Sequence, residues 1–392
     1  MGRVIVTGAG PAGMTAAIHA ARAGARVLLL EKNHEAGKKL LLTGGGRCNL
    51  TNTLAGEQLE IQYPGAGGFL YSAFAQFGPA AICAFFRELG MNLRVEEEGR
   101  VFPRSGGAAS VREVLLEELR RRGVEILYDR EVRKILLSQG RIRGVEAGEE
   151  YAASQVILAT GGASYPATGA TGAGYALAKS VGHKVSPLKP ALASLLVNEQ
   201  WLHSLSGVSL SASCRLRLGK KTVTGTGELL FTHFGLSGPL ALNLSRYLEP
   251  GMQLQLNLLP QQNKEELFSP RESTIGQRLS ALLPHRLSKK LLELAGIEPG
   301  LRALSRAQRT GLAELVFALP VKIAGIKPLG EAMVTCGGVE LREVAPQTMA
   351  SKLIPGLFFA GELLDLDGIS GGYNLTVAFA TGAVAGAAAG GL

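Results

Sequence analysis

The sequence predicts an α/β protein whose two ends together form one domain around an open, largely parallel sheet. Three observations support this prediction. The first 31 residues read as strand, helix and strand, the pattern changes to alternating short strands near Pro187, and α/β patterning returns after Pro328. A chain of 392 residues is also longer than one hydrophobic core usually serves. We therefore expect the middle of the chain to be inserted into the domain that its ends form.

The expected boundaries follow these changes of pattern. The first part of the terminal domain is expected over residues 1–187 and its second part over residues 329–392. Between them we expect a β-rich insertion over residues 188–262 and the helical part of that insertion over residues 263–328. Apolar and polar residues alternate over 209–218 and 252–259, as in half-buried strands. From residue 264 to about residue 324 the apolar spacing is helical, with Arg, Lys and Glu on the polar faces.

Most elements of the terminal domain can be placed from hydrophobic runs and the residues that end them. A helix is expected over 14–23, ending at Gly24, and another over 111–122. Strands are expected over 3–7, 27–30, 124–128, 131–137, 141–146, 156–160 and 357–362. A last helix begins at about Tyr373, and its Ala- and Gly-rich composition predicts a buried helix and not a membrane span.

Charge, aromatic content and cysteine content indicate which kinds of partner and which cellular compartment to expect. The 41 Lys and Arg residues exceed the 32 Asp and Glu residues, for a formal charge of +9, which favours anionic ligands. Only 6% of residues are aromatic, without the interleaved aromatics of a strand-binding groove, so we expect a small-molecule substrate and neither a nucleic acid nor a membrane as partner. The four cysteines form no C-x-x-C pair, which predicts no metal site, no disulfide scaffold and a cytoplasmic location.

The glycine-rich turn after the first strand is the strongest motif. It is a G-x-G-x-x-G sequence between a strand and a helix, made of Gly8, Ala9, Gly10, Pro11, Ala12 and Gly13. The first glycine makes a tight turn, the second lets a diphosphate approach the backbone, and the third lets helix and strand pack closely. The helix start attracts phosphates, and Glu31, at the end of the second strand, can accept hydrogen bonds from both ribose hydroxyls. The turn therefore predicts NAD or FAD in preference to NADP.

The far end of the chain favours FAD over NAD. The last buried strand delivers Gly361 and Glu362 to a strand terminus, where ligands of open α/β sheets bind. Gly372 then precedes a helix that starts with Tyr373 and Asn374. A flavin is long enough to need this second anchor, with Glu362 for its ribityl hydroxyls and the helix amides near its ring. Tyr373 is the candidate catalytic residue.

A third glycine-rich segment runs from Thr43 to Asn49. Its three consecutive glycines, among them Gly45 and Gly46, allow the backbone to lie against a planar ring or a phosphate, and Arg47 supplies a cation. We expect this loop to run along the FAD beside its isoalloxazine ring. Within it, Cys48 fits a small buried residue better than a reactive thiol, because no dithiol partner lies nearby in sequence.

The segment Ala159-Thr160-Gly161 ends a buried strand and resembles the segment by which certain flavoproteins return to the dinucleotide. The other expected cofactor-binding residues are Lys32, Lys39 and Val132. No second strand, G-x-G-x-x-G, helix and acid follow one another in this region. NAD(P)H, if it is the electron donor, is therefore expected to visit the flavin only transiently.

These motifs belong to longer strings that are specific enough to indicate a family. The sequence resembles the BaiN/RdsA-type flavoproteins, a family of NAD(P)/FAD-dependent oxidoreductases also labelled aminoacetone-oxidase-type FAD-binding enzymes. The resemblance covers nearly the whole chain and rests on GAGPAGMTAA, GKKLLLTGGGRCNLTN, VFPRSGGAASV, ILATGGASYPATG, GELLFTHFGLSGPLAL and the block from MVTCGGV to GELLDLDGISGGYN. It implies a glutathione-reductase-like, Rossmann-type FAD domain, an inserted β-barrel with a helical segment, and tightly bound FAD.

The expected function is that of an FAD-dependent oxidoreductase. It would pass hydride from NAD(P)H through the flavin to an organic acceptor, and the resemblance suggests an activated C=C bond as that acceptor. Three alternatives remain open at this point: a flavin oxidase that uses oxygen, a tRNA-modifying flavoprotein, and a flavin carrier without turnover.

Overall fold

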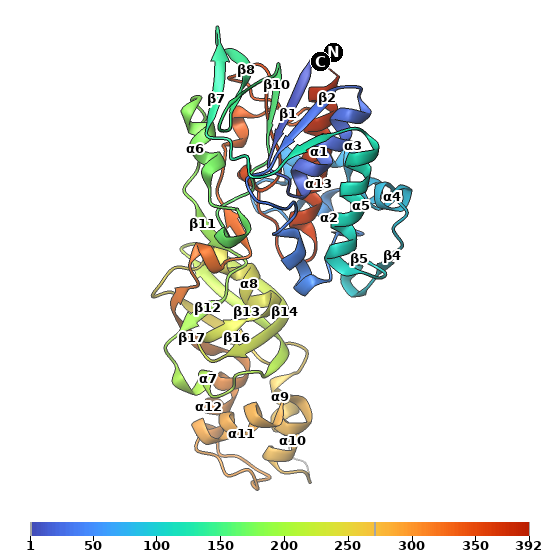
Figure 1. Cartoon of the computed structure of the whole chain (residues 1–392). Helices are drawn as coiled ribbons and strands as arrows, with labels where there is room; N and C mark the ends of the chain where they lie inside the picture. Colours follow the sequence, from blue (N-terminus) through green and yellow to red (C-terminus); the bar gives the residue numbers. More distant parts are fainter. Residues whose placement is uncertain (1, 270–271, 392) are drawn as a thin grey trace. The chain divides into compact units, whose positions relative to one another are not determined.

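The computed structural model describes residues 2–269 and 272–391 (Figure 1). The chain forms two compact units. Unit 1 comprises Met1–Lys189 and Met333–Leu392, and unit 2 comprises Pro190–Ala332. Both ends of the chain thus belong to unit 1, and the middle of the chain folds as a body of its own.

A five-stranded parallel sheet forms the centre of unit 1, in the order β19-β10-β1-β2-β6. Its strands are β1 (Arg3–Thr7), β2 (Arg26–Leu30), β6 (Glu125–Leu127), β10 (Gln155–Leu158) and β19 (Leu357–Phe359). On the central strand, Ile5 pairs with Leu28 on one side and with Val156 on the other. These strands are short apolar runs because both faces of a parallel sheet are covered. The predicted Rossmann-type sheet is confirmed.

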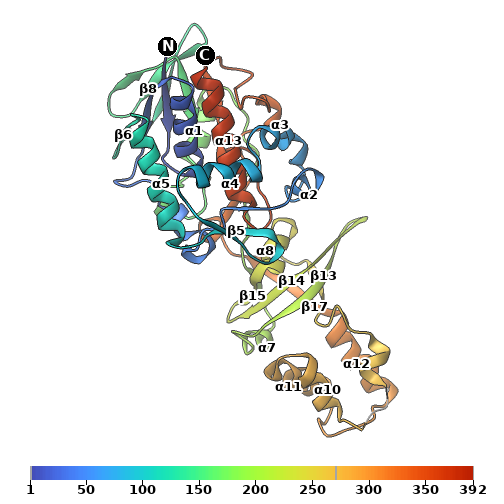
Figure 2. The same ribbon diagram turned by 90° about the vertical axis from the view of Figure 1, so that its right-hand side faces the viewer.

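Two helices from opposite ends of the chain lie side by side on this sheet (Figures 1 and 2). They are α1 (Pro11–Arg22) and α13 (Tyr373–Gly390). Glycines at every fourth position of α13 face alanines at every fourth position of α1, in the pairs Gly382 with Ala12, Gly386 with Ala16 and Gly390 with Ala20. A Cβ on Gly386 would lie only 2.1 Å from the backbone oxygen of Ala16. The small residues of the uncharged tail therefore serve a close helix–helix contact, and α13 is buried as predicted.

Smaller elements complete unit 1. The helices are α2 (Glu57–Glu60), α3 (Gly67–Phe77), α4 (Pro79–Glu88), α5 (Gly107–Arg121) and α6 (Ala173–Ser180). An antiparallel sheet contains β7 (Lys134–Ser138), β8 (Arg141–Glu146) and β9 (Glu150–Ala152), and another contains β3 (Thr51–Asn52), β5 (Arg100–Pro103) and β4 (Leu93–Val95). The chain leaves unit 1 at β11 (Lys189–Ala191) and re-enters it just before β18 (Val334–Cys336).

Unit 2 contains a closed barrel of six strands in the order β12-β15-β14-β13-β16-β17. These are β12 (Leu195–Val197), β13 (Ser209–Leu218), β14 (Lys221–Thr232), β15 (Gly235–Ser237), β16 (Gln253–Asn257) and β17 (Leu319–Ile326). Alternate side chains point inward, for example Cys214, Leu216 and Leu254, which are all buried. Helix α8 (Gly238–Leu244) packs on β14, where a Cβ on Gly225 would lie 3.3 Å from the Leu240 side chain.

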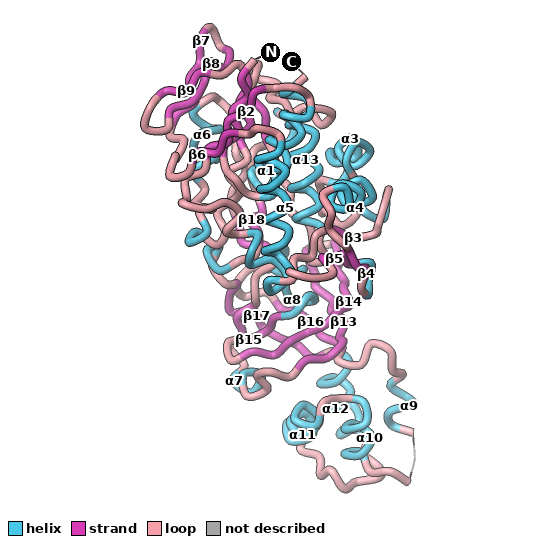
Figure 3. The backbone as a smooth tube through the Cα atoms, turned by 45° about the vertical axis from the view of Figure 1, so that its right-hand side comes forward, coloured by secondary structure: helices cyan, strands magenta, loops and turns pink. Residues whose placement is uncertain are grey.

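The helices of unit 2 are short. Besides α8 they are α7 (Gln200–His203), α9 (Lys264–Phe268), α10 (Ile275–Leu282), α11 (His285–Leu294) and α12 (Arg306–Phe317). Helices α10, α11 and α12 lie together (Figure 3) and share one apolar cluster with the barrel. The expectation of helix to about residue 324 is wrong at its end, because Leu319–Ile326 forms strand β17. The reason is its period of two: Leu319, Val321 and Ile323 are buried, whereas the residues between them are exposed.

By length and composition alone, one helical stretch in the described part of the chain is long and apolar enough to cross a membrane. It covers Gly67–Glu88. Gly78 has an extended backbone, with φ −82° and ψ −173°, and divides this stretch into α3 and α4.

Substituting Gly386 tests how strongly the fold depends on the α1–α13 contact. At an open helix position, Gly→Ala stabilises a protein by about 0.5–1 kcal/mol. Gly311 in α12 is such a position, because a Cβ there would meet nothing within 4 Å. We expect Gly386→Ala instead to lower the free energy of unfolding by about 1–3 kcal/mol, since the new methyl group overpacks against Ala16. Urea unfolding of both variants measures the difference, and equal effects at the two positions would contradict a tight contact.

Candidate cofactor site

Four strands of the unit 1 sheet end beside one another and deliver four of the predicted site segments. Within two residues of the ends of β1, β2, β10 and β19 lie Gly8, Glu31, Ala159 and Gly361. The strands are parallel, so their carboxyl ends share one edge of the sheet. Ligands of open α/β sheets bind at this edge. The predicted residues from both ends of the chain therefore converge at one place.

The turn between β1 and α1 shows why its glycines are needed. Gly8 has φ +94°, and a Cβ on it would lie 2.6 Å from the backbone oxygen of Ala159. A Cβ on Gly13 would lie 1.8 Å from the backbone oxygen of Gly8. At Gly10, in contrast, a Cβ would meet nothing within 4 Å, and no described side chain caps the helix, which begins with Pro11. Gly8 and Gly13 thus allow close packing of the backbone, where a larger residue would not fit. Gly10 instead borders open space at a helix start that is suited to binding phosphate.

Glu31 is buried and already holds the neighbouring backbone. Its Oε2 accepts a hydrogen bond from the Ala9 amide at 2.6 Å, and its Oε1 accepts from the Asn33 amide and side chain at 2.9 and 2.7 Å. The two oxygens of a carboxylate offer about four acceptor positions, so one remains for a further donor. Next to it, Lys32 donates to the Thr171 hydroxyl at 2.9 Å. Val132 is buried two residues beyond Arg130, whose amide donates to the Glu31 carbonyl.

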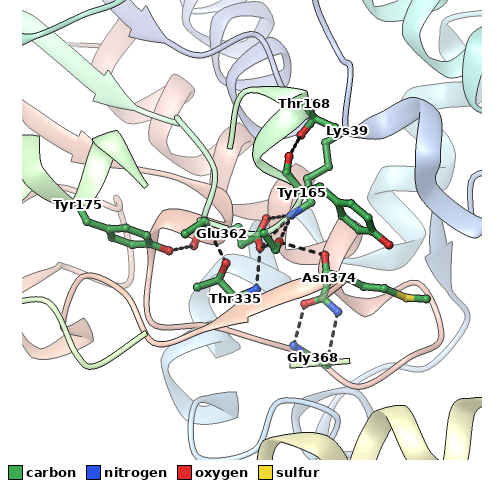
Figure 4. A network of polar contacts seen from close by, with 11 residues as sticks. Lys39, Tyr165, Thr168, Tyr175, Thr335, Glu362, Gly368 and Asn374 are labelled. Carbon is green, nitrogen blue, oxygen red and sulfur yellow. Dashed lines mark hydrogen bonds and ion pairs between the residues drawn. The ribbon is translucent and has the colours of Figure 1, made fainter. Parts of the chain in front are cut away.

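An ion pair between the two ends of the chain lies beside the same edge of the sheet (Figure 4). The Lys39 ammonium lies 2.7 Å from Oε2 of Glu362 and 3.0 Å from its Oε1. Oε1 also accepts from the Ser164 hydroxyl at 3.1 Å and from the Thr335 amide at 2.8 Å. Lys39 is therefore no solvated surface lysine: it joins the first 40 residues to the strand end that carries Glu362.

The charge of Glu362 is stabilised by these partners. Burial alone would raise the pKa of its carboxyl, but the Lys39 ammonium and the hydrogen bonds from Thr335 and Ser164 hold that pKa below its ordinary value. The carboxylate is therefore ionised at neutral pH. Its side chain is 20% exposed, and Oε2 has Lys39 as its one partner among the described residues, so it can accept another hydrogen bond.

The loop with three glycines is tied to the start of α13. The side-chain amide of Asn49 is oriented so that both its oxygen and its nitrogen have a hydrogen-bond partner. The oxygen accepts from the Gly372 amide and the nitrogen donates to the Thr51 carbonyl, each at 3.0 Å. The Thr51 and Thr376 hydroxyls are 2.8 Å apart. Gly45, with φ +64°, borders open space, because a Cβ there would meet nothing within 4 Å. Hydrogen bonds thus join this loop to the helix start, although the two come from opposite ends of the chain.

Two residues of this loop serve the fold. Arg47 donates to both carboxylate oxygens of Glu96 and stacks over the Phe102 ring, so its cation is paired. Cys48 is fully buried, and burial raises the pKa of its thiol to about 12. A thiol with so high a pKa is protonated at neutral pH and is a poor nucleophile. The geometry thus matches the structural interpretation of Cys48.

The residues that begin α13 are held in place by their neighbours. Tyr373 is 6% exposed, and its carbonyl accepts from the Tyr63 hydroxyl at 3.0 Å. Burial raises the pKa of the Tyr373 phenol. The Asn374 side chain bonds both the amide and the carbonyl of Gly368, at 2.9 and 2.8 Å (Figure 4). Asn374 therefore shapes the loop before α13.

Several residues of the site were missed by sequence reasoning. Ser164 and Thr335 bond Glu362, and the Tyr175 hydroxyl donates to the Glu362 carbonyl at 3.2 Å. Ser164 and Thr335 lie in strings that are specific to the family, but such strings do not show which side chains meet. The Thr160 hydroxyl oxygen is buried, with no hydrogen-bond partner in the described part of the chain. The hydroxyl is covered by α6, because a Cβ on Gly174 would lie 1.9 Å from its oxygen.

These features fit a dinucleotide that reaches from one chain end to the other. The open space at Gly10 and the uncapped start of α1 suit a diphosphate. Glu31 and Glu362 are carboxylates with spare acceptor capacity for sugar hydroxyls. The uncapped start of α13 at Gly372 supplies a partial positive charge at the far end.

Comparison with known proteins identifies the family. A family model described as the HI0933-like protein Rossmann domain matches residues 2–388. The chain belongs to the HI0933-like family. One relative is the 3-dehydro-bile acid delta(4,6)-reductase of Clostridium scindens, 36% identical over 410 residues that cover 99% of each chain. Another is the ribosomal RNA dihydrouridine synthase of Haemophilus influenzae, 32% identical over 96% of each chain.

The HI0933-like chain also shares its fold with a solved flavoenzyme. The 3-ketosteroid delta1-dehydrogenase of Sterolibacterium denitrificans superposes with a TM-score of 0.55 over 98% of both chains, at 13% sequence identity. The predicted family and fold class are confirmed. The family is one of FAD-dependent oxidoreductases. Which residues of this chain contact FAD stays a prediction, supported by the convergence described above.

Substituting Gly10 separates cofactor binding from folding. Its backbone, with φ −78° and ψ −179°, is open to any residue, and its Cβ position is free of protein atoms. We expect Gly10→Val to leave the unfolding temperature of the cofactor-free protein unchanged but to weaken FAD binding at least tenfold, or about 1.4 kcal/mol. Gly13→Ala is the matched control and should destabilise the fold itself. Fluorescence titration with FAD and thermal unfolding measure both effects; unchanged FAD affinity in Gly10→Val would contradict the placement of the diphosphate.

Proposed function

We propose that this protein reduces a carbon–carbon double bond conjugated to a carbonyl group, with NADH or NADPH as electron donor. The bound FAD supplies two-electron hydride chemistry between donor and acceptor. The observation that carries the proposal is the packing of α1 on α13, which places an uncapped helix start after Gly10 and another after Gly372, about 14 Å further along. A cofactor that reaches both helix starts must extend well beyond the glycine-rich turn after β1.

The named activities of two relatives support the reaction type. A 3-dehydro-bile acid carries a ketone at carbon 3, and a delta-4 double bond is conjugated to it. Dihydrouridine is uridine with its C5=C6 bond reduced, and that bond is conjugated to the C4 carbonyl. The two substrates differ in size and charge but share this one reacting group. The shared group is the basis of our proposal for the present chain.

The chain's own residues would bind and orient the cofactor. Gly10 and the start of α1 would face the diphosphate, Glu31 the adenosine ribose, Glu362 the ribityl chain and the start of α13 the ring. The Lys39–Glu362 pair would keep the carboxylate ionised and fixed in position. The amides at the start of α13 would stabilise negative charge on the ring.

Tyr373 is our candidate for the proton donor. Reducing a conjugated double bond requires a proton as well as a hydride, and the donor must be protonated before the reaction. A tyrosine phenol is protonated at neutral pH, and burial, which raises the pKa of Tyr373, leaves it in that state. Tyr373→Phe should therefore slow reduction of the acceptor while leaving reduction of the flavin by NAD(P)H unchanged. Equal loss of both half-reactions would rule out this role.

Anaerobic spectroscopy tests the proposed function directly. We expect NADH or NADPH to bleach the absorbance of the oxidised flavin at about 450 nm. An added enone such as a 3-oxo-delta-4 steroid should then restore this absorbance. The product should be heavier than the substrate by two hydrogen atoms, which mass spectrometry detects.

Two outcomes of this experiment would contradict the proposal. Rapid reoxidation by air with formation of peroxide, and none by enones or uridine, would identify an oxidase. No bleaching by either nicotinamide would identify a flavin carrier or an enzyme with another electron donor.

A further inference from the structure

The positive charge of the chain is concentrated in unit 2. Residues 190–332 contain 16 Lys and Arg residues and 10 Glu residues, with no Asp, so this unit holds +6 of the chain's formal charge of +9. The larger unit 1 is close to balanced, with 25 basic and 22 acidic residues. The site proposed for FAD lies in unit 1, so the cofactor does not account for the charge of unit 2.

Five of these cations gather on the outer surface of the barrel. We call them the basic face: Arg215, Arg217, Lys220, Lys221 and Lys322. All five are exposed, on β13, on the turn to β14, on the first residue of β14 and on β17. The barrel brings them together because β13, β16 and β17 are neighbouring strands (Figure 3).

The register places these residues in two rows across the sheet. In one row Arg215 lies between Thr224 and Gln255. In the adjacent row Arg217 pairs with Thr222, and Lys322 pairs with Gln253. Alternate residues of a strand are about 7 Å apart on one face. The rows therefore form an array of cations, hydroxyls and amides on an exposed sheet surface.

The cationic side chains of the basic face have no ion-pair partner among the residues that the structure describes. None of its five side chains forms an ion pair or a hydrogen bond with another residue in the described ranges. By contrast, Arg121 and Arg122 of unit 1 both bond the Glu118 carboxylate. The acid on the same face of β14, Glu228, lies opposite Ser211, about 13 Å along β13 from Arg215. One other carboxylate touches the basic face, because Oε1 of Glu199 accepts from the Lys322 backbone amide at 2.9 Å, while the five cationic side chains stay unpaired among the described residues.

The chemistry of this face fits the phosphate backbone of RNA. Arg, Lys, Thr and Gln side chains are the groups that hydrogen-bond phosphate and sugar oxygens. The exposed residues of these rows include no aromatic side chain on which an unpaired base could stack. They also include no large apolar side chain that would enter a lipid bilayer. A folded RNA, whose helices are recognised through their backbone, fits better than a single strand or a membrane.

We propose that the basic face binds the backbone of structured RNA. The proposal goes beyond the proposed function, because it depends on the charge and register of unit 2 and not on the reaction in unit 1. It also revises the expectation, drawn from the low aromatic content, that nucleic acid is no partner. The low aromatic content argues against stacking of unpaired bases on the protein. Binding to the phosphate backbone, in contrast, needs only cations and hydrogen-bond donors.

The test compares two variants with the same change of net charge. In the first, Arg215, Arg217, Lys220, Lys221 and Lys322 are replaced by Gln. In the control, five exposed cations of unit 1 are replaced by Gln, namely Arg26, Arg87, Lys134, Arg141 and Lys179. The full-length, FAD-loaded proteins are titrated against a fluorescent hairpin RNA with a stem of about 20 base pairs, the size class that backbone-reading domains span, and against purified ribosomal RNA. Anisotropy is measured over a range of salt concentrations.

We expect the wild type to bind with a steep salt dependence, a slope of log K against log salt of about −3 to −5. The first variant should bind at least tenfold more weakly, with a slope shallower by about three, whereas the control should change by less than about threefold. Equal losses in both variants would show a response to net charge alone and would overturn the proposal. Binding to anionic phospholipid vesicles but not to RNA would also overturn it.

Two further measurements keep the test decisive. Reduction of the flavin by NAD(P)H should be the same in both variants and the wild type, which separates failure of RNA binding from failure of the proposed function. Photo-crosslinking of the wild type to RNA containing 4-thiouridine should label peptides within residues 209–224 and 319–326. Labelling confined to unit 1 would contradict the proposal even if the first variant fails to fold.

Discussion

The contact between α1 and α13 determines where both ends of the chain lie. At three successive helical turns a glycine of α13 faces a backbone oxygen of α1, so closely that a methyl group on Gly386 would approach Ala16 to 2.1 Å. This contact explains a tail that is rich in Ala and Gly and carries no charge after Asp367. Ala12, near the start of α1, packs on Gly382, nine residues into α13, so the uncapped start of α13 lies about 14 Å beyond the uncapped start of α1. The contact that stabilises the fold thus also positions the site.

Three polar links hold the rest of the site together, and each joins the first 52 residues to the last 31. The Lys39–Glu362 pair, the Asn49 amide at Gly372 and the paired hydroxyls of Thr51 and Thr376 all cross between these segments. Such a site exists only in the folded chain. For unit 2 we propose a separate role, because the unpaired cations of its barrel are suited to holding a large anionic partner.

Much of this architecture could be predicted from local patterns. The glycine motif, the strand runs and the start of α13 at Tyr373 depend on neighbours in sequence, and the structure places them where the patterns do. Strand β17 was missed because its apolar residues continue directly from a helical segment, and its period of two is only eight residues long. The partners of Glu362 could not be predicted, because Ser164 and Thr335 reach it only through the tertiary fold. Similarly, the pairing of Glu96 with Arg47, 49 residues earlier in the chain, depends on the tertiary fold and could not be predicted.

Hydrogen exchange with and without FAD tests most directly whether both chain ends bind a single cofactor. Amide exchange should slow on addition of FAD in two segments that are far apart in sequence, residues 8–14 and residues 361–376. Both segments should respond at the same FAD concentration, because one ligand contacts both. Protection of the first segment alone would show that the C-terminal helix start takes no part in binding, and it would contradict a site shared by both chain ends.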